Sequence, residues 1–395
     1  MTVCWVRIWM RAAQPYTMTE GHHRAIVETL IYQLLNVECM IISSFFSGAG
    51  GLDRGFEQAG FDVAWANEYD KTIWATYQAN FPNSILDVRS IVHIQETDVP
   101  DCDGMIGGPP CQSWSEAGAA RGIEDHRGQL FFEYIRILEA KRPKFFLAEN
   151  VSGILFQRHR AAFERILGRF SELGYHVSYA LMNASNYGVP QDRERVIIVG
   201  YRTDLGIRFE HPKPLSNKVG LRHAIADLQD TVVPAIGRDK PNPDVVVPNH
   251  EYMTGGFSSM FMSRNRVRPW DKPSFTIQAG GRHAPLHPQA PAMLKVAKDQ
   301  LVFAPGHEDL YRRLSVRECA RIQTFPDTHQ FVYKSVADGY KMIGNAVPVE
   351  LARVLAEKIR QDLGSLRRVP GKSPPKKTLQ PGEIREIDAG RSEGS

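Results

Sequence analysis

A cysteine stands at the end of a rigid loop in the first third of the chain. The segment is 107–115, with the sequence GGPPCQSWS. Its two glycines let the backbone turn without steric cost, and its two prolines then stiffen the loop. Cys111 therefore sits where a nucleophile would be needed, and it would react as its thiolate. A buried structural thiol is the alternative, because most free cysteines pack as small apolar side chains. The loop alone leaves both interpretations open.

A glycine-rich turn nearer the N-terminus is typical of a nucleotide cradle. The apolar run 41–46 is followed by the turn 47–51 (SGAGG) and by a predicted helix over 53–59. Glycines let a ligand approach the backbone, and the N–H groups of the helix face it. The spacing is not that of the dinucleotide fingerprint, because the third glycine of that pattern would fall later, at Gly55. A glycine turn by itself is a weak signal.

Glu68 strengthens the interpretation of that turn. It ends the next apolar run, about 20 residues after the turn, where a carboxylate can bind both hydroxyls of a ribose. A solvated strand end is the alternative for Glu68, and the ribose interpretation is preferred because the turn precedes it. Tyr69 could lie against an adenine ring, and Asp87 after a third short strand is a candidate for the adenine edge.

Residues 257–285 combine cations, amides and aromatic rings. Against the single acid Asp271 stand five cations: Arg264, Arg266, Arg268, Lys272 and Arg282. Asn265, Gln278 and His283 add polar groups. Such a surface suits DNA, since arginine can pair with guanine, amides with adenine, and other cations with phosphate. An ordinary solvated loop is the alternative and the commoner case for basic runs.

The elements that must position these residues alternate along the chain. Strands are predicted at 41–46, 63–70, 85–86, 103–106, 145–151, 176–182 and 196–201, and helices at 53–59, 129–141, 161–173, 314–324 and 349–363. Alternation up to about residue 202 indicates a mostly parallel α/β sheet. Glu149 closes the apolar strand 145–151, where a carboxylate is costly unless it has a task or a partner.

The composition is ordinary for a globular protein of 395 residues, with 43% hydrophobic and 23% charged residues and a net charge of +4. There is no apolar run long enough for a membrane span and no pattern of a secretory signal, so a cytoplasmic location is expected. The five cysteines are scattered, which predicts neither a metal site nor a disulfide framework.

Seven motifs occur in the order that one family shows. They are 46–51 (FSGAGG), 67–70 (NEYD), 109–112 (PPCQ), 149–151 (ENV), 191–195 (QDRER), 317–321 (RECAR) and 344–348 (GNAVP). From Met40 to about Leu363 the chain resembles the DNA cytosine-C5 methyltransferases. The resemblance implies an α/β fold of the class I S-adenosylmethionine-dependent methyltransferases, Rossmann-like with a mostly parallel sheet, and a smaller, irregular, β-rich target-recognition domain. Segments 261–268 (FMSRNRVR) and 286–291 (LHPQAP) look like the HaeIII-type subgroup, which modifies the inner cytosine of GGCC.

The resemblance assigns roles to residues. C5 of cytosine is a poor nucleophile until the thiolate of Cys111 adds at C6 of the ring. Glu149, holding a proton, would be the partner of N3 and N4 as charge builds on the ring. Arg195 would bind O2, and Pro110 would stiffen the loop that carries Cys111. The methyl donor S-adenosylmethionine is expected at Phe46, Gly48, Ala49, Gly51, Glu68, Tyr69, Asp87, Asn345 and Ala346. DNA contacts are expected from Ser115, Arg264, Asn265, Arg266, Arg268, Gln278, Arg282 and His283, and Arg193 is expected to be either structural or directed to a DNA phosphate. The target base must leave the duplex stack, and the loop 113–128 is expected to close over it.

The expected organisation is a catalytic and cofactor domain over 40–204, a target-recognition domain over 205–325, a return segment over 326–363 and a disordered tail over 364–395. Residues 1–39 are expected to be an extension ahead of a natural start at Met40, with a docked N-terminal helix as the alternative. The expected partners are double-stranded DNA and a functionally linked restriction endonuclease, with the protein a monomer. The alternative functions are a tRNA methyltransferase, a non-catalytic DNA-binding module and a dinucleotide oxidoreductase. The last leaves Cys111, Glu149 and Arg195 unexplained.

Overall fold

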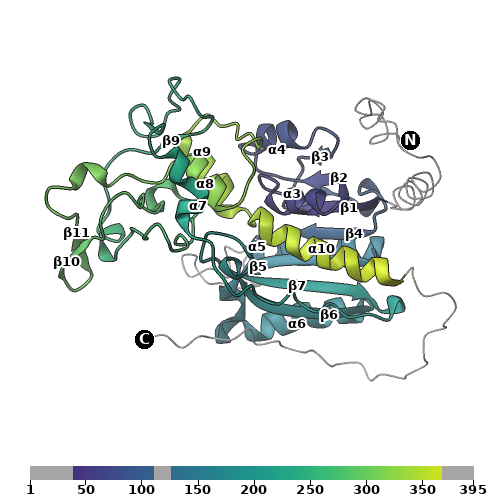
Figure 1. Cartoon of the computed structure of the whole chain (residues 1–395). Coiled ribbons are helices and arrows are strands. Elements are labelled where there is room, and N and C mark those ends of the chain that lie inside the picture. The colour runs from purple at the N-terminus through teal and green to yellow at the C-terminus, as the bar shows by residue number, and fades with distance from the viewer. Residues whose placement is uncertain (1–38, 111–125, 367–395) are drawn as a thin grey trace, which may run out of the picture. The chain divides into compact units, whose positions relative to one another are not determined.

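A seven-stranded sheet forms the centre of the computed structural model, which describes residues 39–110 and 126–366 (Figure 1). Its strands are β1 (Met40–Phe45), β2 (Phe61–Asn67), β3 (Ile85–Asp87), β4 (Gly104–Gly107), β5 (Phe145–Val151), β6 (Tyr175–Asn183) and β7 (Glu194–Arg202). Their order is β3-β2-β1-β4-β5-β7-β6. Strand β7 runs antiparallel to both of its neighbours, whereas β1 to β5 pair in parallel. The predicted, mostly parallel α/β sheet is confirmed.

Strand β5 illustrates how the sequence buries this sheet on both faces. Phe145 and Leu147 belong to the core cluster on one face, and Phe146 and Ala148 belong to the cluster on the other. Successive side chains of a strand point to opposite faces, so a strand that is covered on both sides has a continuous apolar sequence.

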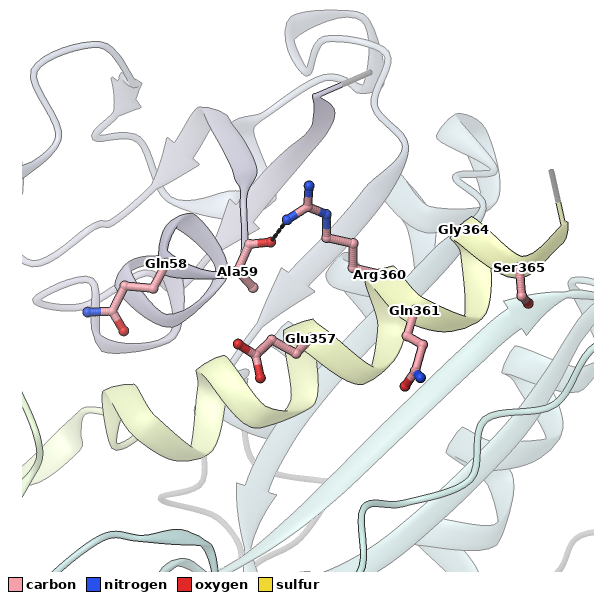
Figure 2. A pocket seen from close by; sticks show the side chains of 7 residues that line it. All are labelled: Gln58, Ala59, Glu357, Arg360, Gln361, Gly364 and Ser365. Atoms are coloured by element: carbon pink, nitrogen blue, oxygen red, sulfur yellow. Dashed lines mark hydrogen bonds between the residues drawn. The ribbon is translucent and has the colours of Figure 1, made fainter. Parts of the chain in front are cut away.

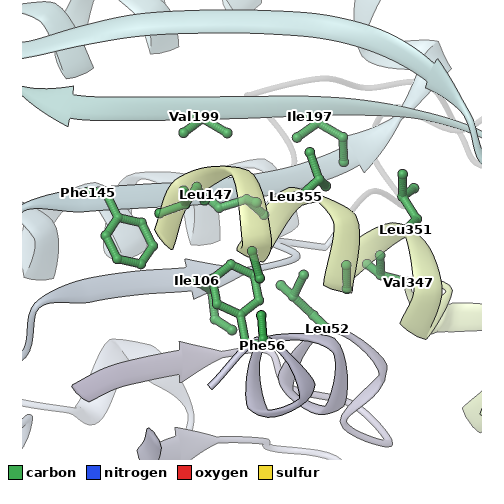
Figure 3. Packing of buried hydrophobic residues seen from close by; sticks show 14 of the residues in the cluster. Leu52, Phe56, Ile106, Phe145, Leu147, Ile197, Val199, Val347, Leu351 and Leu355 are labelled. Atoms are coloured by element: carbon green, nitrogen blue, oxygen red, sulfur yellow. The ribbon is translucent and has the colours of Figure 1, made fainter. Parts of the chain in front are cut away.

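Helices cover each face of the sheet. On one face lie α3 (Gly51–Gln58) and α10 (Val349–Leu366), and Figure 3 shows Leu52 and Phe56 of α3 and Leu351 and Leu355 of α10 packed against Ile106, Leu147, Ile197 and Val199 of the sheet. On the other face lie α5 (His126–Lys141) and α6 (Arg160–Glu172), whose apolar side chains, such as Tyr134 and Phe170, fill the second cluster. The result is a three-layer arrangement of helices, sheet and helices.

Residues 205–345 have a different texture. Short helices, α7 (Leu221–Ile225), α8 (Val316–Ile322) and α9 (Val336–Asn345), accompany two small sheets, β8 (Val233–Pro234) with β9 (Glu251–Tyr252) and β10 (Leu294–Ala297) with β11 (Gln300–Val302). Helices α7, α8 and α9 share one core cluster, which also contains Ala49 and Ile73 from the first part of the chain. The irregular second region therefore packs directly beside the glycine-rich turn.

Several element predictions were incomplete. The helices α4 (Trp74–Asn80), α7 and α9 were not predicted. Ser335 caps the N-terminus of α9, and its hydroxyl accepts a hydrogen bond from the N–H of Ala337, so a capping residue was present in the sequence. Helix α10 continues to Leu366, so the predicted disordered tail begins at least three residues too early. Residues 1–38 and 367–395 lie outside the described part of the chain, together with the predictions made for them.

Candidate active site

The carboxyl edge of the sheet collects the predicted site residues. Strand order reverses between β1 and β4, and open α/β sheets bind ligands outside the carboxyl ends of their strands at such a point. The glycine-rich turn follows β1, Glu68 follows β2, the Pro109–Pro110 loop follows β4, and Glu149 lies near the end of β5. Residues that are distant in sequence therefore meet at one edge.

Glu149 and Arg195 form an ion pair across two adjacent strands. The register of β5 and β7 places Arg195 opposite Val151, so that its side chain is diagonal to that of Glu149. Arg195 Nε lies 2.7 Å from Glu149 Oε1, and both side chains are largely buried, with 13% and 11% of their surface exposed. This partner explains how a carboxylate can close an apolar strand. The structure brings these two predicted catalytic residues together.

The loop that leads to Cys111 lies against the same carboxylate. A methyl group placed on Gly108 would lie 3.2 Å from Glu149 Oε2, so the backbone passes close to that oxygen. The side-chain amide of Asn150 donates a hydrogen bond of 3.4 Å to the carbonyl of Pro109. The chain is described as far as Pro110. Cys111, Ser115 and the loop expected to close over the base, up to residue 125, lie outside the described residues.

The glycine-rich turn and Glu68 are joined by hydrogen bonds. The N–H of Gly48 donates to Glu68 Oε2 at 2.9 Å, and the N–H of Asp70 donates to Glu68 Oε1 at 2.7 Å. Burial raises the pKa of Glu68, and these two N–H groups act against that rise. Phe46, with φ 53°, and Gly48, with φ 55°, both adopt the left-handed region. A non-glycine residue held in that conformation is typical of ligand sites.

Tyr69 and Asp87 flank Glu68 at the same edge. Tyr69 is 71% exposed, so its ring is available to a ligand. The N–H of Glu68 donates to the carbonyl of Asp87 at 3.1 Å, which places the two residues side by side. The carboxylate of Asp87 accepts hydrogen bonds from Arg89; burial acts to raise the pKa of Asp87, but these bonds lower it overall. A ligand that binds the carboxylate of Asp87 would therefore share it with the guanidinium of Arg89.

At three of the predicted cofactor residues, the Cβ position points into the protein interior and not toward a ligand. Ala49 and Ala346 lie in a core cluster, and a methyl group on Gly51 would lie 2.3 Å from the carbonyl oxygen of Val347. Only the backbone of these residues could reach a ligand. Gly48 differs, because a methyl group built there would have no atom within 4 Å and would enter open space. Asn345 is exposed at the end of α9.

Arg193 has the structural one of its two expected roles. Its side chain is 1% exposed, which excludes the alternative contact with DNA. Its guanidinium donates to three carbonyl oxygens, those of Ile277 at 3.1 Å, Gly344 at 2.8 Å and Ala346 at 2.9 Å. Arg193 thus ties the predicted recognition region to the segment that precedes α10. A buried guanidinium spread over three carbonyls is a structural tie and not a surface contact.

Sequence reasoning missed two further residues of this edge. Asp53, fully buried in the first turn of α3, accepts hydrogen bonds from Ser44 at 2.6 Å and Tyr77 at 2.7 Å. Burial raises the pKa of Asp53 to about 6. Lys341 of α9 forms an ion pair with Asp70, two residues beyond Glu68. An acid in the first turn of a helix was a visible signal for Asp53, whereas no local pattern pairs residues 70 and 341.

The family of the chain follows from the comparison with known sequence families. The profile described as C-5 cytosine-specific DNA methylase matches residues 40–361. The chain belongs to this family. The prediction of a DNA (cytosine-5) methyltransferase is thereby confirmed. Type II methyltransferase M.FnuDI of Fusobacterium nucleatum is 55% identical to this methylase over 336 residues, which cover 84% of the chain and 97% of the relative. M.NgoPII of Neisseria gonorrhoeae is 57% identical over 329 residues, 82% of the chain and 96% of the relative.

Solved structures share the fold of this methylase. DNMT2 of Spodoptera frugiperda matches with a TM-score of 0.59 at 18% identity, covering 82% of this chain and 99% of that one. The Dnmt2 methyltransferase of S. pombe matches with a TM-score of 0.57 at 15% identity and the same coverage. The predicted fold class is confirmed.

The side chains of the basic segment of the methylase are of two kinds: some form hydrogen bonds or ion pairs within the protein, and others have no such partner among the described residues. Asn265 belongs to the first kind, since its side chain accepts a hydrogen bond from the N–H of Met293 at 3.1 Å and donates one to the carbonyl of Val267 at 2.8 Å. Arg266 donates to the carbonyl of Phe261 at 2.8 Å, and Arg268 lies 3.1 Å from Asp192. These three residues shape the segment, which limits what they could offer DNA.

Arg264, Gln278 and Arg282 are exposed, and within the described part of the chain their side chains have no hydrogen bond or ion pair. His283 is half-buried. Its burial lowers the pKa of His283, and the nearby charges of Arg266, Arg282 and Arg313 lower it further. These three arginines are thus close enough to His283 to affect its protonation. A polyanion bound there would reduce the electrostatic repulsion between the positive charges.

A cavity of about 600 Å³ lies away from this site. Figure 2 shows it between the end of α3 and the last turns of α10, lined by Gln58, Glu357, Arg360, Gln361 and neighbouring residues, and no predicted site residue lines it. Across the described ranges, no helix is long and apolar enough to cross a membrane, and no three His, Cys, Asp or Glu side chains are grouped to hold a metal ion.

Proposed function

We propose that this methylase transfers a methyl group from S-adenosylmethionine to C5 of the inner cytosine of GGCC in double-stranded DNA, through a transient bond between Cys111 and the base. The observation that carries the proposal is the buried pair of Glu149 and Arg195, 2.7 Å apart, beside the loop that ends in Pro109 and Pro110. A carboxylic acid and a guanidinium side by side can hold one edge of a pyrimidine.

The roles of the residues follow from the chemistry of cytosine. The thiolate of Cys111 would add at C6, and electron density would then rise at C5 and on N3. Glu149 would donate a proton to N3 through Oε2, the oxygen that faces Gly108, and would accept a hydrogen bond from the N4 amino group. Arg195 would hold O2 while its Nε keeps Glu149 oriented. After methylation, loss of the C5 proton and departure of Cys111 would restore the aromatic ring.

The residues at the ends of β1 and β2 fit S-adenosylmethionine, which supplies an electrophilic methyl group on a sulfonium. Open space above Gly48 would receive the ligand, and Glu68 beside it would accept from ribose hydroxyls. The exposed ring of Tyr69 would lie against the adenine. Asn345, exposed at the end of α9, would serve the amino-acid end.

Sequence specificity for GGCC rests on the variable region. Residues 261–268 and 286–291 resemble the GGCC-modifying subgroup. The exposed Arg264 has the groups that pair with guanine, the base that makes up half of this site on each strand, and the exposed Arg282 is a cation suited to a phosphate. Gln278 is exposed as well. Ser115 would contact DNA from the loop after Cys111.

We also infer a wider context. The type II relatives favour a role in a restriction–modification system, with a cognate endonuclease acting on the same site. The domain division at residues 204 and 325, a monomeric state and a cytoplasmic location remain part of this proposal.

The proposal is tested by expressing the chain in a host free of cytosine methylation. Its DNA should become resistant to an endonuclease that cuts GGCC, and bisulfite sequencing should place the methyl group on the inner cytosine. A control site such as CCGG should be cut as before. Full cleavage at GGCC in cells that contain soluble protein would refute the specificity.

A further inference from the structure

A second cavity, of about 440 Å³, lies on the recognition side of α9. Two turns form its walls, residues 236–240 and residues 280–283, and we call it the two-turn cavity. Its lining includes Arg238, Asp239, Met253, Arg282, His283 and Lys341. None of the roles assigned above uses Arg238.

The first turn is held rigidly by its backbone. Ile236 and Lys240 exchange two backbone hydrogen bonds, of 2.9 and 3.2 Å. The N–H of Thr254 donates to the carbonyl of Arg238 at 3.0 Å, and the N–H of Val336 donates to the carbonyl of Asp239 at 2.7 Å. The side chain of Arg238 is nevertheless exposed, and its guanidinium bonds to no other described residue. A fixed turn thus presents an uncommitted cation.

The second turn is fixed by close packing. A methyl group on Gly281 would lie 2.6 Å from the ring of Tyr340 and 3.0 Å from the sulfur of Met253, so this turn fits tightly against α9. Arg282 follows Gly281 and is exposed. Both walls are therefore preorganised, which reduces the entropy lost when a ligand binds.

Of the two acids that line the cavity, Asp239 has a side-chain partner, whereas the carboxylate of Asp338 has none among the described residues. Asp239 accepts a hydrogen bond of 3.0 Å from the hydroxyl of Ser335. Asp338 lies in the first turn of α9, where the helix dipole favours an acid. Lys341 is engaged by Asp70. The uncommitted charges that remain on the two walls are the guanidinium groups of Arg238 and Arg282.

We propose that the two-turn cavity binds one phosphate of the DNA backbone between Arg238 and Arg282. The inference rests on the proposed function, since DNA is the ligand, and it adds an anchor that reads no base. Guanidinium groups form charge-assisted bonds with phosphate oxygens, and each neutralised phosphate releases counterions. Arg238 would thus set the position of the recognition region on the duplex without affecting which bases are read.

The test compares Arg238→Gln with Arg208→Gln. Arg208 is an exposed arginine that follows β7 near His176, at the opposite edge of the sheet from Glu149. Affinity for a GGCC duplex and for a scrambled duplex is measured over a series of salt concentrations. Arg238→Gln should weaken both by the same factor, roughly three- to tenfold, and should reduce the slope of log affinity against log salt by about 0.9. Arg208→Gln should change neither.

Two results would overturn the inference: an unchanged salt slope, or a loss confined to the GGCC duplex, which would make Arg238 a base reader. The double variant with Arg282→Gln supplies a further test. If one phosphate is shared, the double loss should be smaller than the sum of the single losses; additive losses would mean separate contacts. A scan with neutral methylphosphonate linkages should find one position that weakens the wild type and not Arg238→Gln. Absence of GGCC methylation by the wild type would instead refute the proposed function.

Discussion

Replacing Arg193 by methionine should destabilise the protein and weaken its hold on the methyl donor. The change leaves the buried carbonyls of Ile277 and Gly344 without this donor, and it leaves the carbonyl of Ala346 with only the 3.4 Å hydrogen bond from the side-chain amide of Gln323. Each unpaired buried acceptor costs about 1–3 kcal/mol. Relief of burying a charged guanidinium offsets part of that cost, so a net loss of about 3–5 kcal/mol is expected. Lysine should recover only part of the loss, because one ammonium group cannot span three carbonyls in the geometry of a guanidinium.

Chemical denaturation measures the first effect, and calorimetric titration with S-adenosylmethionine measures the second, because Arg193 holds the carbonyl of Ala346 next to Asn345. Arg208→Met is the matched control, an exposed arginine whose loss should stay within about 0.5 kcal/mol. A loss below about 1 kcal/mol for Arg193→Met, with unchanged cofactor affinity, would refute the view of Arg193 as a tie between regions.

Three other changes test separate parts of the site. Gly108→Ala should lower the methylation rate about tenfold, because the new methyl group would lie 3.2 Å from Glu149 Oε2 and would displace it. Gly168→Ala is the control: its methyl group has no atom within 4 Å, so the rate should not change. Glu68→Ala should weaken S-adenosylmethionine about 10- to 100-fold in a binding titration, since a hydrogen bond to a charged group is worth about 1.5–3 kcal/mol; a wild-type affinity would remove Glu68 from the cofactor site. Burial raises the pKa of Asp53 from its ordinary value of 3.8 to about 6 in the folded protein, so its contribution to stability is greatest below pH 4 and is lost as the pH rises through about 6. The difference in free energy of unfolding between Asp53→Asn and the wild type should therefore shift in favour of the variant by up to about 3 kcal/mol between pH 4 and pH 8, as measured by urea unfolding. A difference that does not change with pH would contradict the raised pKa of Asp53.

The sequence was most informative where periodicity and burial coincide. The continuous apolar run of β5 and the amphipathic pattern of α10 predicted their elements within a few residues. Glu149 was recognised as a residue in need of a partner because it ends such a run. The partner, Arg195, came from the family resemblance, since the antiparallel register of β5 and β7 is a tertiary property that no local pattern contains.

The surface expected to read DNA was the hardest part to predict. Charge and residue type alone treated Asn265, Arg266 and Arg268 like Arg264, although only the last lacks a partner among the described residues. Whether a polar side chain in a loop is tied to a carbonyl depends on how the loop folds back on itself. For Arg193 the sequence left a structural role and a phosphate contact open, because the burial of a long cation depends on tertiary packing.

The central claim is that Cys111 attacks a cytosine held by Glu149 and Arg195, and trapping the bond tests it most directly. Fluorine at C5 cannot leave as a proton does, so a GGCC duplex with 5-fluorocytosine at the inner position should retain the enzyme once methylation has occurred. Mass spectrometry of the denatured complex should locate the nucleotide on the peptide that contains Cys111, and Cys111→Ser should give no adduct while still binding the duplex. An enzyme that methylates the ordinary duplex but forms no adduct at Cys111 would contradict the account.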